Sequence, residues 1–152
     1  MTDIAASNIA AHGGSEEELL AARLAPDMLP LSSQIEIAVN FALRACFPPA
    51  GRPVPPFGEF LPTFAGLQAR IARASALLAA LNEADFAGAE HRVMDTQAGE
   101  AALSLPAPAF LYQYAIPNFF FHVTTAFAIL RHHGVPLGKG DFDGFHVYAH
   151  RS

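Results

Sequence analysis

Residues 108–133 restrict the fold most strongly, because they predict a long helix that is apolar on every side. Four phenylalanines between positions 119 and 127 point in widely different directions at about 100° per residue. The end of this helix is well marked, since Gly134 follows directly and Pro136 comes two residues later. A helix without a polar face is buried on most sides, so the sequence predicts that other helices pack around this one.

Apolar residues at helical spacing predict two further long helices and one short helix upstream. The short helix begins after Ser15, whose hydroxyl is placed to accept from an amide of the first turn. The first long helix is expected to be capped by Asp27, with Pro30 in its first turn, and to end at Cys46. The second is expected to cover residues 59–82. With the last helix, these elements predict an all-α bundle.

The remaining segments carry weaker signals. Residues 1–14 are expected to form an irregular arm or a stub of at most two turns, which leaves the first helix of a four-helix bundle truncated. Residues 83–106 lose the helical period, and the flanks of their turns are able to pair as a small β-hairpin before the last helix. Residues 137–152 are expected to form a tail. A parallel sheet is excluded, because strands and helices do not alternate.

Length and composition favour one helical domain over residues 1–152. Hydrophobic residues make up 52% of the chain and charged residues 15%, which suffices for a core. No apolar run approaches the length of a membrane span, and the N-terminus does not resemble a secretory signal. The net charge is −5 and Lys139 is the only lysine, so we expect no nucleic-acid surface. These features predict a soluble, cytoplasmic protein.

Polar residues form one stripe on the otherwise apolar last helix. They occur at offsets of 0, 4, 8 and 11 residues and are Tyr114, Asn118, His122 and Thr125. Helical geometry places them within an arc of roughly 80°. Gln34 of the preceding long helix is positioned to face this stripe. Burying such groups without partners costs about 1–3 kcal/mol each, so each needs a hydrogen bond or a ligand.

Two interpretations of the stripe stay open. In the first, neighbouring groups satisfy His122 and Asn118, which then only fix the register of the bundle. In the second, the stripe lines a pocket in which His122 and Asn118 are catalytic, while Tyr114, Thr125 and Gln34 contact the substrate. A histidine titrates near pH 6.5, so His122 is the member of the stripe suited to proton transfer at neutral pH.

Two parts of the chain resemble a known family. They are PNFFFHVTTA at 117–126 with ILRH at 129–132 and Gly134-Val135, and ARLAPDM at 22–28 with Pro30 and Gln34. Both are similar to segments typical of the bacterial and fungal domain-of-unknown-function family DUF1993. That family is grouped with the DinB/YfiT-like four-helix bundles, which include metal-dependent thiol transferases and isomerases.

The resemblance implies where a metal would bind. DinB-like proteins usually hold a divalent ion with one histidine on the second helix and an HxxxH pair on the last. His122 matches the second histidine of that pair, but Asn118 stands in place of the first and Asn40 lies near the second-helix position. Because zinc and nickel prefer imidazole to an amide oxygen, we expect no metal and no cofactor.

The favoured function is binding or acid–base conversion of a small, partly apolar molecule in a pocket centred on His122 and Asn118. The alternatives are a metal-dependent transferase or hydrolase of the DinB type and a non-catalytic assembly module. A truncated first helix would leave apolar side chains of the 119–127 region or of residues 59–82 uncovered. We therefore expect a two-fold homodimer.

Overall fold

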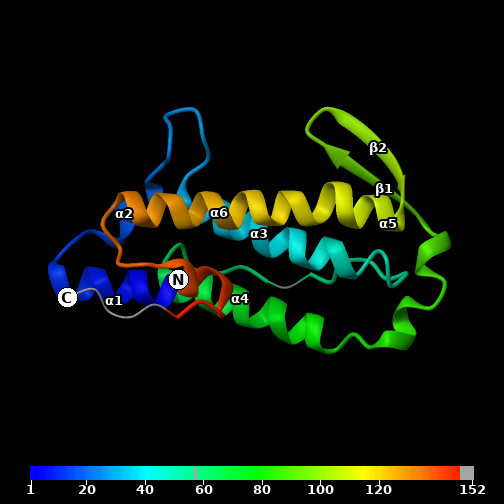
Figure 1. Cartoon of the computed structure of the whole chain (residues 1–152), viewed down its shortest axis with the longest axis horizontal. Coiled ribbons are helices and arrows are strands. Elements are labelled where there is room, and N and C mark those ends of the chain that lie inside the picture. The colour runs from blue at the N-terminus through cyan, green and yellow to red at the C-terminus, as the bar shows by residue number, and fades with distance from the viewer. Residues whose placement is uncertain (57, 148–152) are drawn as a thin grey trace.

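The computed structural model describes residues 1–56 and 58–147, which form the helical bundle of Figure 1. Its α-helices are α1 (Thr2–His12), α2 (Glu16–Ala21), α3 (Leu31–Cys46), α4 (Phe64–Ala79), α5 (Ala107–Ala109), α6 (Ile116–His132) and α7 (Lys139–Asp143). Two 3₁₀ helices, η1 (Glu83–Phe86) and η2 (Ala89–His91), precede the strands β1 (Val93–Ala98) and β2 (Ala101–Pro106). A π-helix, η3 (Phe110–Ala115), joins α5 to α6.

Helices α3, α4 and α6 are the long elements of the bundle. α3 lies in the middle and packs against α6 on one side and α4 on the other. α5, η3 and α6 follow one another as a continuous rod (Figure 1). This rod and its end at Gly134, which has a positive φ of 81°, confirm the predicted last helix. Pro117 lies inside this rod, directly after the π-helical segment, where the Ile116 N–H bonds the Leu111 carbonyl five residues earlier.

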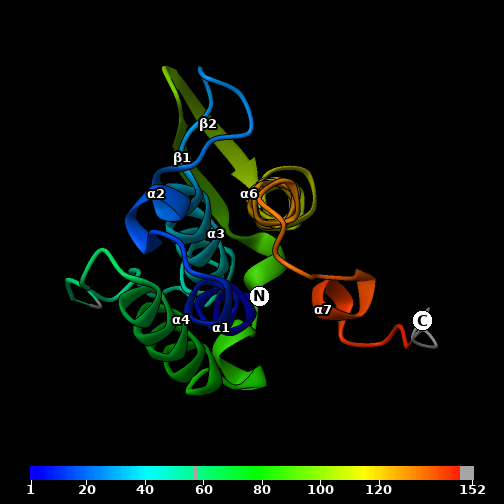
Figure 2. The ribbon, with the colours of Figure 1, turned by 90° about the vertical axis from the view of Figure 1, so that its left-hand side faces the viewer.

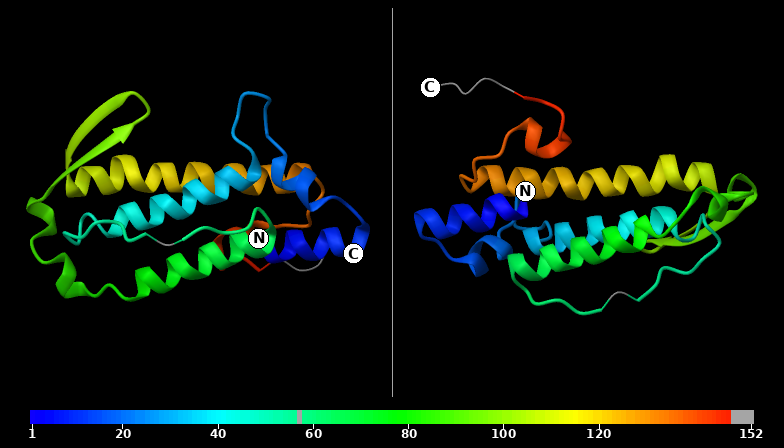
Figure 3. Two further views of the ribbon diagram at one scale, coloured as in Figure 1. Left: turned by 180° about the vertical axis from the view of Figure 1, so that it is seen from behind. Right: turned by 90° about the horizontal axis from the view of Figure 1, so that it is seen from below.

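α1 is a regular helix of 11 residues, so the prediction of an irregular arm or a stub of at most two turns is wrong. Its own sequence has weak amphipathic character, and tertiary packing supplies the stability instead. Ala5 is fully buried in a cluster with Leu19 and Leu20 of α2 and Ile129 of α6. α1 lies alongside only the end of the bundle at which α6 ends (Figures 1 and 3). The first helix is therefore short, as expected.

Two helix starts differ from the sequence prediction. α3 begins at Leu31 after Pro30, and Asp27 lies in the preceding loop rather than at the cap. α4 covers 64–79 rather than 59–82, because the Thr63 side chain accepts from the amide of Gly66 and fixes the first turn there. The backbone of Leu61 passes so close to Gly66 that a Cβ would overlap it. Because the chain at Leu61 folds back over Gly66, the helix does not continue upstream of residue 64.

The hairpin predicted before the last helix is present. β1 and β2 pair antiparallel from Val93↔Pro106 to Ala98↔Ala101 around Gly99 and Glu100, and Gly99 has a positive φ of 59°. The hairpin and the loop of residues 22–30 project from the same side of the α3–α6 layer, whereas α4 lies on the other side (Figure 2).

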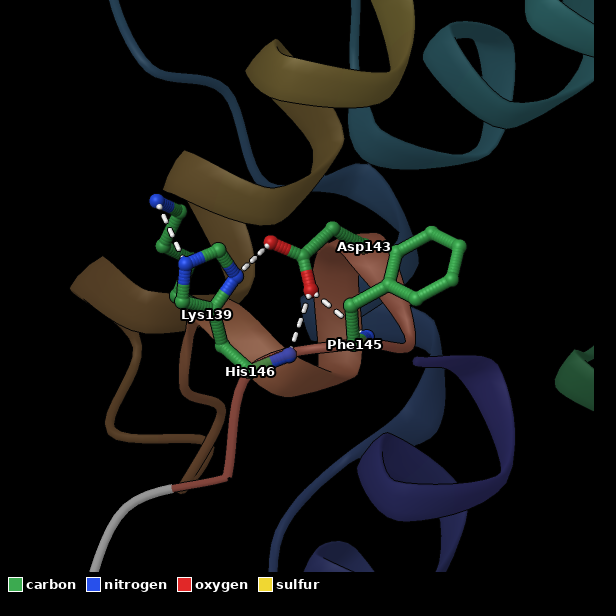
Figure 4. Close-up of polar contacts among 4 residues, drawn as sticks. All are labelled: Lys139, Asp143, Phe145 and His146. Carbon is green, nitrogen blue, oxygen red and sulfur yellow. Dashed lines mark hydrogen bonds and ion pairs between the residues drawn. The ribbon is translucent and has the colours of Figure 1, made fainter.

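The described part of the tail contains one short helix that the sequence analysis did not predict. The Asp143 carboxylate lies at the end of α7 and accepts hydrogen bonds from the backbone amides of Phe145 and His146 at 2.9 and 3.0 Å. Its other oxygen lies 2.5 Å from His146 Nδ1, and Lys139 Nζ lies 3.2 Å from Nε2 of the same ring (Figure 4). The hydrogen bonds from these two backbone amides contribute most to lowering the pKa of Asp143, and the contacts with the His146 ring add to them, so that the pKa falls to about 2.

Among the described residues, no helix has both the length and the apolar character that crossing a membrane requires.

Candidate functional site

His122 and Gln34 form a hydrogen-bonded pair between α6 and α3. The distance from His122 Nδ1 to Gln34 Oε1 is 2.6 Å. Gln34 Nε2 donates to the carbonyl of Leu29 at 3.1 Å, so the amide group is oriented and its oxygen is left to accept. The imidazole must therefore donate from Nδ1. The neutral tautomer consequently carries its lone pair on Nε2.

Aromatic rings surround the His122 imidazole. Phe41 of α3 stacks on it with the ring centroids 6.0 Å apart, and Phe121 meets it edge-on at 5.2 Å. Gln34 is only 1% exposed. Partial burial lowers the pKa of His122 below its usual 6.5, so the ring is uncharged at pH 7.

The other members of the stripe make separate hydrogen bonds. Asn118 donates to the carbonyl of Tyr114 and Thr125 donates to the carbonyl of Phe121, each one turn earlier and each at 2.7 Å. The Tyr114 hydroxyl donates to Gln97 of β1 at 3.1 Å. Of the five predicted site residues, the structure thus joins only His122 and Gln34 side chain to side chain. Asn118, Thr125 and Tyr114 therefore find the hydrogen-bond partners that they need within the chain, and they do not require a ligand.

The residues at the expected metal positions do not fit a metal centre. Asn40 accepts from Arg70 of α4 at 3.1 Å, and it is Gln34 rather than Asn40 that faces His122. The Asn40 side chain is therefore directed at α4 and not at His122. Within the described ranges, no three His, Cys, Asp or Glu side chains lie close enough to hold an ion. A lone imidazole beside two amides is a poor donor set for zinc or nickel.

A cavity of about 420 Å³ lies between α3, α4 and α6, on a different side of α6 from the His122–Gln34 pair. Its walls are almost entirely apolar. The lining residues are Met1, Thr2, Ile35, Ala38, Val39, Ala42, Ile71, Ala74, Ser75, Leu78, Phe119, Val123, Ala126 and Leu130. His122 and Asn118 are not among them, so the expectation of a pocket centred on those two residues is wrong for this cavity.

The cavity is open because small side chains face it. Thr2, the first residue of α1, and Met1, which precedes it, line the cavity. Ala38, Ala74 and Ala126, from three different helices, are each at most 5% exposed and leave the central space unfilled. Sequence analysis missed these residues. The available signal was the four-residue spacing of Ala38 and Ala42 within an otherwise large-residue apolar face.

The arrangement of the helices is that of a DinB-like bundle. The model of the family described as "Domain of unknown function (DUF1993)" matches residues 2–143. The chain therefore belongs to this family, as the sequence resemblance indicated.

A solved structure, the DinB family member from Shewanella denitrificans, is similar with a TM-score of 0.81 and 32% identity. The match covers 98% of this chain and 84% of that one. It confirms the DinB-like fold. Comparison with curated proteins gives no match.

Proposed function

We propose that this protein binds a small, largely apolar molecule in the cavity between α3, α4 and α6. The cavity itself carries this proposal. Its volume of about 420 Å³ falls within the range of about 300–1,000 Å³ that is usual for small-molecule sites. Its walls offer aliphatic and aromatic contacts and two polar side chains, Thr2 and Ser75. Such a site favours an apolar ligand, because transfer from water gains about 25 cal/mol per Å² of buried apolar surface.

The composition of the walls supports a binding role over a packing defect. Protein interiors contain few voids larger than a water molecule, and a void costs stability in proportion to its volume. Here Ala38 and Ala42 of α3 and Ala74 of α4 surround one space, and a larger apolar residue at any of these positions would occupy part of it. A ligand that binds there would recover the lost contacts.

The test is binding of an apolar fluorescent probe, phenylnaphthylamine, followed by emission on titration. We expect saturable binding to the native chain. Ala38→Leu and Ala74→Leu, each of which occupies part of the cavity, should weaken it strongly. Both variants should melt at or above the native temperature, because cavity filling commonly adds about 0.5–2 kcal/mol. Ala76→Leu is the matched control, since Ala76 is exposed on the same helix as Ala74. Unchanged binding by both cavity variants would refute the proposal.

His122 supports a second function, proton transfer to or from a ligand at the α3–α6 seam. The supporting observation is that Nδ1 is held by Gln34 while Nε2 has no hydrogen-bond partner among the described residues. A neutral imidazole with an open lone pair is suited to act as a general base. His122→Gln should then abolish turnover of a ligand while Thr125→Val leaves it unchanged. If turnover persists in His122→Gln, the pair is structural.

A further inference from the structure

The N-terminal end of α1 opens into the cavity. Met1 and Thr2 both line it, and the amide groups of the first turn of a helix have no partners within the helix. The cap position, Met1, supplies no side-chain hydrogen bond to them. This end of the helix also carries the positive pole of the helix dipole.

The Thr2 hydroxyl is a second polar group at the same place. Thr2 is 9% exposed and lines the cavity, and no hydrogen bond of its side chain occurs among the described residues. Threonines deeper in a helix bond the carbonyl one turn earlier, as Thr125 does to Phe121. Thr2 lies in the first turn of α1, where no earlier turn offers a carbonyl. Because its oxygen is accessible from the cavity, this hydroxyl is able to donate to a ligand atom that accepts a hydrogen bond.

Side-chain charges of the described residues near this end of α1 do not supply a partner for an anion, so the amides of the first turn and the helix dipole would have to hold it. No charged side chain lines the cavity. Asp3 is in the first turn of α1 and is exposed, so its carboxylate faces solvent, where water screens it. Ser75, the other polar side chain of the wall, is exposed on α4.

We propose that the ligand is a medium-chain fatty acid, whose alkyl chain lies in the cavity and whose carboxylate is bound by the Thr2 hydroxyl and the first amides of α1. This proposal rests on the proposed function, because it requires that the cavity accept an apolar chain. It adds the chemical class of the ligand and its orientation. The carboxylate accepts hydrogen bonds at the α1 end, and the methyl end points toward Phe119 and Leu78.

The experiment measures displacement of bound phenylnaphthylamine by three ligands of equal chain length: decanoate, decanol and decylamine. We expect decanoate to displace the probe at the lowest concentration and decylamine at the highest. Thr2→Val keeps the shape of the side chain and removes the donor. It should weaken decanoate binding by about 10- to 150-fold and leave phenylnaphthylamine binding unchanged, since a hydrogen bond to a charged group is worth about 1.5–3 kcal/mol. Thr124→Val, on the exposed side of α6, should change neither.

Each outcome separates the inference from the proposed function. If the probe binds but decylamine equals decanoate, or if Thr2→Val leaves decanoate affinity unchanged, the fatty-acid proposal fails and the cavity proposal stands. If Ser75→Ala rather than Thr2→Val weakens decanoate, the carboxylate lies at the other wall and the proposed orientation is wrong. If neither the probe nor any of the three ligands binds, both proposals fail.

Discussion

The His122–Gln34 hydrogen bond should couple α6 to α3 energetically, and a double-mutant cycle measures this directly. Gln34→Met retains the length of the side chain but removes the acceptor of His122 Nδ1 and the donor to Leu29. A net loss of about 0.5–1.5 kcal/mol per hydrogen bond gives a destabilisation of about 1–3 kcal/mol. For a chain of this length, this lowers the melting temperature by roughly 2–4 °C per kcal/mol.

The cycle combines Gln34→Met with His122→Phe, which keeps a ring against Phe41, and follows unfolding by urea and circular dichroism. We expect a coupling energy of about 0.5–1.5 kcal/mol, above the scatter of roughly 0.3–0.5 kcal/mol for independent sites. The control cycle pairs Gln34→Met with Tyr114→Phe, whose hydroxyl bonds the hairpin, and should be additive. Additive effects in the first cycle would show that the pair does not link the helices.

Three further predictions follow from the site and the bundle. Because burial lowers the His122 pKa below the unfolded value of 6.5, its contribution to stability is full above pH 6.5 and is lost as pH falls through the folded-state pKa. Urea unfolding at pH 7 and pH 5 should show this loss in the native chain and less of it in His122→Gln. Elemental analysis should find no stoichiometric zinc, nickel or iron, and one ion per chain that disappears in His122→Ala would contradict the donor-set argument. Light scattering should give a homodimer of twice the 16.2 kDa chain mass, since Phe120 and Phe121 are 49% and 56% exposed, and a stable monomer would refute it.

Elements with local end signals were predictable, and elements held by distant contacts were not. Gly134 and Pro136 mark the end of α6, and Gly99 marks the hairpin turn. Both the helix end and the turn need a backbone conformation that residues adjacent in the sequence provide. α1 was missed because an alanine-rich segment of its length is marginal alone and is stabilised by burial of Ala5 against α2 and α6. The start of α4 depends on Leu61 folding over Gly66, a contact that residue spacing does not reveal.

The candidate site was predictable only in part, for the same reason. Gln34 was expected to face the polar stripe because it lies beside the core residue Ile35, and the structure places it against His122. The sequence did not reveal that Asn118 and Thr125 bond their own helix, because that choice depends on side-chain rotamers. It also did not reveal the cavity, whose walls come from several separate helices.

Methyl NMR during titration with an apolar ligand tests the central claim, the binding of a small apolar molecule inside the bundle, most directly. The account predicts saturable shifts of the methyl groups of Ala38, Ala74 and Ala126, which line the cavity from three helices. The methyl group of Ala76, exposed on α4, should not move. Shifts confined to Ala76 and other surface methyl groups, or cavity methyl groups that stay unchanged at saturating ligand, would contradict it.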